Sequence, residues 1–217
     1  TSGRPSPTEA AHVAEDLSGK IAMIIDGGPV GIGIESTIID LTEDTPMVLR
    51  PGYITPQMLS KVLGKEVIID PGIIAADDTR KPKAPGMKYK HYAPKADMAI
   101  VDGTRKHVIA KINELVASHR DDGKKIAVIA TEETKQFYDA DVVLSMGSRA
   151  DEDSIAHELY RILRDCDELD VDVIFSESFS TPRIGQAIMN RMLKAAGHQV
   201  IDTHVKYDKI IFVAQTG

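Results

Sequence analysis

Apolar and polar residues along the second half of the chain form blocks that predict alternating strands and helices. Four short apolar runs predict buried strands, at residues 96–103, 125–131, 141–147 and 171–178. Four amphipathic stretches predict helices, at residues 104–123, 134–140, 151–169 and 183–197. Strands that are apolar throughout are typical of a parallel sheet covered on both faces. We therefore expect a Rossmann-like, three-layer α/β domain over residues 96–217.

Residues 1–70 follow a different pattern, with shorter elements and more turns. Thr8 and Thr55 are suited to cap helices over residues 8–19 and 55–64, and a glycine ends each of them. Short apolar runs predict extended segments, at residues 21–26, 35–42, 46–50 and 66–70. These elements predict a separate, smaller α/β domain.

Residues 71–95 are the predicted linker between the two domains. Prolines recur there among charged residues, with few aliphatic side chains, at Pro71, Pro82, Pro85 and Pro94. Within this segment, "KAPGMKYKHYAP" (residues 83–94) carries prolines and Gly86, which stiffen the chain and keep it out of either neighbouring domain.

Composition narrows the function classes. The net charge of −7 over 217 residues excludes a global basic field for nucleic acid, although it leaves room for a local basic patch. A single cysteine, Cys166, excludes a disulfide framework and favours a reducing, cytoplasmic setting. No apolar run approaches the roughly 20 residues that span a bilayer, and we expect no membrane partner. Because the sequence opens at Thr1 in a turn-rich segment, we expect a fragment of a longer protein.

Candidate chemistry in the first domain lies around a glycine-rich loop. "GGPVGIGIEST" (residues 27–37) lacks the spacing of a nucleotide-binding motif and leads into a strand, so by itself it favours a flexible loop. The hydroxyls of Ser36 and Thr37 are suited to a carboxylate or phosphate, and the alternative is plain strand surface. Arg50, at a predicted strand end, is suited to phosphate, and the alternative is a surface arginine at a turn.

The second domain offers less. Polar residues follow one predicted strand, where open α/β sheets often bind ligands, at Glu177, Ser178 and Ser180. Solvated loops are the favoured alternative there. The histidines lack metal-binding spacing, at His107, His119, His157 and His198. We predict no catalytic nucleophile–histidine–acid set and no protein metal site.

Four motifs in order carry a resemblance to a known family. "TSGRPSPT", "ESTIID", "VLRPG" and "PGMKYKHYAP" resemble the long, two-domain threonylcarbamoyl-AMP synthases, which are YrdC-like tRNA-modification enzymes. "IAHELYRILRDCDEL" and "GQAIMNRMLKAAG" resemble the C-terminal domain of that family. The resemblance implies that residues 1–70 are the C-terminal part of a YrdC-like twisted-sheet domain and that residues 71–95 form a lid. Since the family's phosphate-binding lysine and arginine would precede Thr1, we expect weak ATP binding and no catalysis by this chain alone.

The resemblance also implies a reaction. The family makes threonylcarbamoyl-AMP and pyrophosphate from L-threonine, bicarbonate and ATP with Mg²⁺, and its product feeds the tRNA threonylcarbamoyl-transfer machinery. A carbamate that attacks the α-phosphorus needs positioning and charge neutralisation rather than a covalent enzyme intermediate. The implied ATP contacts are Thr8, Arg50 and Tyr92, and the implied threonine contact is Ser36. The implied supporting contacts are Ser2, Thr37, Lys90 and His91.

Three other readings stay open at the level of sequence. A tRNA- or double-stranded-RNA-binding module without catalysis would use the local lysine cluster with its interleaved tyrosines, at Lys81, Lys83, Lys88, Tyr89, Lys90 and Tyr92. A transferase for a simple carbamoyl group would use the same fold. Such enzymes carry extra zinc-finger or acylphosphatase modules, and this sequence has no Cys-x-x-Cys motif. A nucleotide-sensing regulatory domain would occupy residues 96–217.

Overall fold

The structure is a computed structural model that describes residues 5–73, 93–179 and 184–204. Its larger part is a five-stranded sheet in which every neighbouring pair of strands is parallel, in the order β6-β5-β7-β4-β8. The strands are β4 (Asp97–Asp102), β5 (Ile126–Ala130), β6 (Val142–Ser145), β7 (Val173–Glu177) and β8 (Val200–Asp202). The predicted parallel α/β sheet is confirmed.

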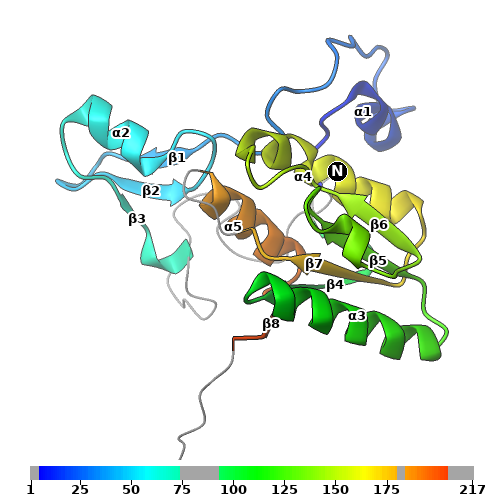
Figure 1. Cartoon of the computed structure of the whole chain (residues 1–217). Helices are drawn as coiled ribbons and strands as arrows, with labels where there is room; N and C mark the ends of the chain where they lie inside the picture. Colours follow the sequence, from blue (N-terminus) through cyan, green and yellow to red (C-terminus); the bar gives the residue numbers. More distant parts are fainter. Residues whose placement is uncertain (1–4, 74–92, 180–183, 205–217) are drawn as a thin grey trace, which may run out of the picture.

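Helices cover both faces of this sheet (Figure 1). Side chains alternate along β4: Met98 and Ile100 pack into one apolar cluster with α4 (Glu152–Glu168) and α5 (Gly185–Ala195). Ala99 and Val101 pack into a second cluster with α3 (Arg105–Asp121). Because both faces are buried, the strands are apolar throughout, which is the signal that the sequence showed.

Two details of this sheet differ from the sequence prediction. Residues 134–140 form only a single 3₁₀ turn, η2 (Lys135–Phe137), because Tyr138 turns inward and its hydroxyl donates to Glu177 at 2.6 Å. The edge strand β8 was not predicted. It has three residues and a half-exposed Val200, so it carries no apolar run, and pairing with β4 creates it.

The smaller sheet comes from the first part of the chain. Its strand β2 (Met47–Arg50) pairs antiparallel with β1 (Ile38–Asp40) and parallel with β3 (Ile68–Ile69). Helix α2 (Pro56–Leu63) begins where the Thr55 hydroxyl accepts from the Met58 amide at 3.2 Å. It ends at Gly64 with φ +63°, as predicted. In Figure 1, α5 lies between the smaller and the larger sheet.

Two predictions for the N-terminal segment are wrong. Residues 21–26 form no strand, and Met23 and Ile25 are 75% and 89% exposed, because no described strand lies beside them to complete a ladder. Thr8 does not cap a helix. Helix α1 (Ala10–Leu17) begins after Glu9, and the buried Thr8 hydroxyl bonds to the His12 ring at 3.3 Å.

Helix α1 lies beside α4 in Figure 1, and one arginine joins them. Arg164 of α4 is buried, with a side-chain exposure of 1%. It donates to the carbonyl of Pro5 at 2.6 Å and to the carboxylates of Glu15 at 2.8 Å and Asp16 at 2.9 Å. The N-terminal segment is therefore bound to the larger α/β unit. Among the described helices, none has the length and apolar character needed to cross a bilayer.

Candidate functional site

Arg50 and Ser36, two residues singled out by the sequence, lie in direct contact. Arg50 is the last residue of β2, and the ladder with β1 sets it opposite Ile38. Its guanidinium donates from Nε to the Ser36 carbonyl at 3.0 Å and from Nη2 to the Ser36 hydroxyl at 3.1 Å. This fork fixes the arginine beside the end of the glycine-rich loop while Ser36 itself stays exposed.

A cavity of about 510 Å³ adjoins this pair. It is lined by Ile32, Ile34, Glu35, Ser36, Thr37, Ile39, Tyr53, Ile54 and Leu59. The walls are mainly apolar, and residues 35–37, just before β1, contribute hydroxyl and carboxylate groups. This is the usual composition of a small-molecule site. The Thr37 hydroxyl donates to the Ile54 carbonyl at 2.7 Å, so it also fixes the cavity wall.

Gly52 brings the turn after Arg50 against that segment. A Cβ atom at Gly52 would lie 2.4 Å from the Glu35 carbonyl oxygen and 2.6 Å from the Thr37 amide nitrogen. Only glycine permits such an approach of two backbones. Packing against residues 35–37 therefore requires glycine at position 52.

Side chains from the larger α/β unit contact the backbone and side chains next to this pair. Arg191 of α5 is fully buried; its Nε donates to the Glu35 carboxylate and its Nη2 donates to the Pro51 carbonyl at 3.0 Å. The Tyr160 hydroxyl of α4 also donates to Glu35, at 2.6 Å. Glu35 precedes Ser36 and Pro51 follows Arg50, so Arg191 contacts the chain neighbour of each member of the pair. Sequence reasoning missed Arg191, although an arginine among the apolar residues Ile188, Met192 and Ala195 is an available signal.

A lysine near this contact has an altered proton affinity. Burial, together with the positive charge of Arg191, lowers the pKa of Lys194 to about 8. Lys194 is 4% exposed and lies on the same buried face of α5. Its ammonium group therefore loses its proton at a lower pH than that of a solvent-exposed lysine.

Of the other predicted contacts, the structure describes Thr8, which lies apart from this pair. Thr8 is buried against His12, and within the described ranges no hydrogen bond joins Thr8 to Ser36 or Arg50. The remaining predicted contacts lie outside the described residues: Ser2, Lys90, His91 and Tyr92. The rest of the lysine and tyrosine cluster lies outside them too, as do most of residues 71–95. Over residues 5–73, 93–179 and 184–204, no His, Cys, Asp and Glu side chains form a group of three that could hold a metal.

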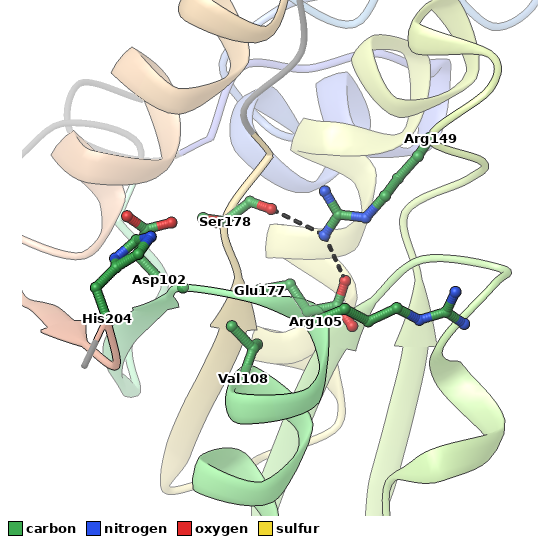
Figure 2. Close-up of a pocket in the computed structure, with 8 residues that line it drawn as sticks. Asp102, Arg105, Val108, Arg149, Glu177, Ser178 and His204 are labelled. Atoms are coloured by element: carbon green, nitrogen blue, oxygen red, sulfur yellow. Dashed lines mark hydrogen bonds and ion pairs between the residues drawn. The ribbon is translucent and has the colours of Figure 1, made fainter.

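A second cavity, of about 530 Å³, lies at the carboxyl edge of the larger sheet (Figure 2). It includes Glu177 and Ser178, at the strand end that the sequence pattern indicated, while Ser180 falls outside the described residues. Within it, Arg149 donates to the Glu177 carboxylate at 2.7 Å. Burial and the Glu177 carboxylate raise the pKa of Tyr138 far above its ordinary value, so its hydroxyl remains a donor to Glu177.

Comparison with known proteins gives matches along most of the chain. A family model described as "Threonylcarbamoyl-AMP synthase, C-terminal domain" matches residues 54–197, and one described as "Telomere recombination" matches residues 1–52. Threonylcarbamoyl-AMP synthases from Bacillus subtilis and Pyrococcus abyssi are 47% and 48% identical over 92% of the chain. The chain spans 56% of the length of each of these relatives.

A solved structure agrees with these matches. The crystal structure of P. abyssi Sua5 complexed with L-threonine superposes with a TM-score of 0.83 at 46% identity. The alignment covers 94% of this chain and 57% of that one. The sequence matches and the superposed structure thus indicate the same family over both the smaller and the larger sheet. The chain belongs to the threonylcarbamoyl-AMP synthase family.

Proposed function

We propose that the protein carrying this chain makes threonylcarbamoyl-AMP from L-threonine, bicarbonate and ATP, with release of pyrophosphate. The observation that carries the proposal is the contact of Arg50 with Ser36, which lines the 510 Å³ cavity. Relatives that share this segment are named for that product, and one of them was solved with L-threonine.

In this proposal Ser36 contacts L-threonine, and Arg50 contacts ATP together with Thr8 and Tyr92. A hydroxyl at the mouth of a mainly apolar cavity suits a small amino acid that carries both a methyl and a hydroxyl group. The guanidinium of Arg50 suits the phosphates, because its fork donates several hydrogen bonds at once. Supporting contacts are assigned to Ser2, Thr37, Lys90 and His91.

The proposed chemistry requires little from side chains beyond placement and charge. The threonine amine and bicarbonate give a carbamate and water. A carbamate oxygen then attacks the α-phosphorus of ATP while the bond to the leaving pyrophosphate breaks. Catalysis of such a displacement is mainly positioning and electrostatic stabilisation. Mg²⁺ would neutralise the triphosphate, and we assign it to the phosphate oxygens of ATP. The apolar walls formed by Ile34, Ile39 and Ile54 would exclude water from the labile carbamate.

We also propose roles for the larger parts of the chain. Residues 1–70 supply the substrate contacts, residues 71–95 act as linker and lid, and residues 96–217 support the site through Arg191 and Tyr160. The product would pass in the cytoplasm to the machinery that modifies adenosine in tRNA. This division assigns a positioning role to the second unit that the sequence pattern alone did not indicate.

The test is pyrophosphate release by the whole protein with L-threonine, bicarbonate and ATP. We expect Ser36→Ala to raise the KM for L-threonine with little change in the KM for ATP. Arg50→Ala should lower kcat/KM for ATP by about 100-fold, the loss typical of one well-placed donor. Arg120→Ala is the matched control, because Arg120 is 43% exposed and, within the described residues, forms its ion pair with the exposed Asp139.

The outcomes separate clearly. Release that does not depend on L-threonine or bicarbonate would contradict the reaction. Equal KM values for L-threonine in the wild-type and Ser36→Ala proteins would contradict the assignment of Ser36. An unchanged kcat/KM in Arg50→Ala would contradict the assignment of Arg50.

A further inference from the structure

The cavity at the carboxyl edge of the larger sheet plays no part in the reaction proposed above. Its volume of about 530 Å³ falls within the range of small-molecule sites. The adjacent strands β4 and β7 end there, and the chain leaves them for α3 on one face and α5 on the other. Open α/β sheets bind ligands in the crevice at such a point.

Side chains from four separate segments meet in this crevice. They are Asp102 at the end of β4, Arg149 before α4, Glu177 and Ser178 at the end of β7, and His204 after β8. In Figure 2 the Asp102 carboxylate and the His204 ring lie together on one side, and Arg149 reaches in from the other side. The cavity thus presents an acidic side and a cationic side to one occupant.

Arg149 is held in place but is not fully used. Its Nη2 donates to the Glu177 carboxylate at 2.7 Å and to the Ser178 carbonyl at 2.9 Å, and its guanidinium lies over the Phe179 ring at 5.5 Å. Within the described part of the chain, Nε and Nη1 have no hydrogen-bond partner. The Glu177 side chain is 2% exposed, whereas that of Arg149 is 38% exposed. The buried carboxylate therefore orients a guanidinium that still has donors to offer a ligand.

The start of α3 adds to the cationic side. Its first turn has no acidic residue, and the Thr104 hydroxyl bonds to the His107 ring at 3.1 Å instead of capping the helix. The backbone N–H groups there carry the positive end of the helix dipole. Gly103, which lines the cavity, precedes them with φ +146°, and a Cβ there would lie 2.0 Å from the Thr203 hydroxyl, so this close turn requires glycine.

We propose that this cavity binds a nucleoside phosphate. The phosphate lies against Arg149 and the start of α3, and the ribose hydroxyls donate to the carboxylate of Asp102. The cavity is far larger than one phosphate ion, and a ligand with an anionic end and a hydroxyl-bearing end matches its two sides. The inference is independent of the roles assigned to Ser36 and Arg50.

The experiment titrates AMP into the 217-residue chain carrying Arg50→Ala. This substitution impairs the proposed nucleotide contact at the first cavity, so the AMP binding that is measured reports on the second cavity. Binding is followed by amide chemical shifts and calorimetry. We expect shifts at Gly103 and Ser178, and affinities for adenosine and for inorganic phosphate at least about tenfold weaker than for AMP. Absence of AMP-dependent shifts at these amides would overturn the proposal. Inorganic phosphate binding as tightly as AMP would overturn the nucleoside part, and equal binding of adenosine would overturn the phosphate contact.

Two variants test the residues in the same background. Arg149→Lys keeps a cation for the buried Glu177 but loses the fork, and should weaken AMP binding by about tenfold. Asp102→Asn leaves that ion pair untouched and should also weaken AMP binding, while leaving phosphate binding unchanged. Arg120→Lys, at the opposite end of α3, is the control. If Arg149→Lys fails to fold, Asp102→Asn decides the result: unchanged AMP affinity in it would contradict the model.

Discussion

At the residue scale, Gly52 is where the first cavity is most tightly packed. Gly52→Ala would press a methyl group onto the backbone of residues 35–37, which has no flexible end to move aside. We expect a loss of about 1–3 kcal/mol in the free energy of unfolding, as for other overpacked sites. Under the role proposed for Ser36, L-threonine affinity should fall as well, because the displaced segment carries that residue.

Gly27→Ala is the control for this substitution. Nothing lies within 4 Å of a Cβ built at Gly27, and its φ lies outside the left-handed region. Chemical denaturation followed by circular dichroism measures both variants. Equal stabilities of Gly52→Ala and Gly27→Ala would show that the turn after Arg50 does not pack against residues 35–37.

At the element scale, α4 and α5 hold the N-terminal part of the chain through buried arginines. Arg191→Ala removes the donor to Glu35 and to the Pro51 carbonyl. Breaking a buried ion pair on one side typically costs about 3–5 kcal/mol, because the remaining charge is left without its partner. We expect the free energy of unfolding to fall by about this amount. Tyr160→Phe, which removes one hydrogen bond to Glu35, should cost less.

Arg161→Ala on α4 is the matched control for Arg191→Ala. Arg161 is 38% exposed, and it forms ion pairs with Glu158 and Asp165 of the same helix. Surface pairs of this kind contribute less than about 1 kcal/mol. Thermal unfolding compares the variants, and a larger loss in Arg161→Ala than in Arg191→Ala would refute the view that α5 anchors the first cavity.

The contact between α1 and α4 predicts an acid dependence. The hydrogen bond from Arg164 lowers the pKa of Asp16 from 3.8 to about 2. Since the folded-state pKa is below the unfolded one, the stabilisation is present above about pH 4 and is lost as the pH falls toward 2. Unfolding measured between pH 5 and about 2.5 should therefore show a steeper loss of stability in the wild type than in Asp16→Asn.

Asp139→Asn tests whether this acid dependence belongs to the buried pair. The Asp139 carboxylate is 91% exposed and lies 3.4 Å from Arg120, so its pair is screened by solvent. Its substitution should leave the pH profile as in the wild type. A profile flattened equally by Asp139→Asn and Asp16→Asn would count against a special role for the Arg164 contact.

At the scale of the whole molecule, apolar side chains are exposed along one segment. Ile21, Met23, Ile25, Val30 and Ile32 are all at least 40% exposed. Contiguous exposed apolar residues favour association. We expect concentration-dependent self-association of the 217-residue chain, measurable by sedimentation velocity. Met23→Lys with Ile25→Lys should reduce it, whereas Lys substitution of the more isolated Val200 should not. A chain that stays monomeric at high concentration would contradict this prediction.

The sequence by itself determined the parallel sheet and most of its helices. Strands β4, β5 and β7 are buried on both faces, and burial on both faces requires a continuous apolar run. Such a run is visible in the sequence before the structure is known. Thr55 and Gly64 likewise bound α2 through local chemistry. The motifs around Ser36 and Arg50 also indicated, from sequence alone, the residues that the fold brings into contact.

Only the tertiary structure decided the rest. Residues 21–26 have the composition of a strand but pair with none of the described strands. Strand β8 has no apolar run, yet it forms because it pairs with β4. A strand depends on its neighbours for backbone hydrogen bonds, so composition cannot settle either case. The same holds for Arg191, Tyr160 and Glu35. Their contacts join residues 125 to 156 positions apart, which no local pattern encodes.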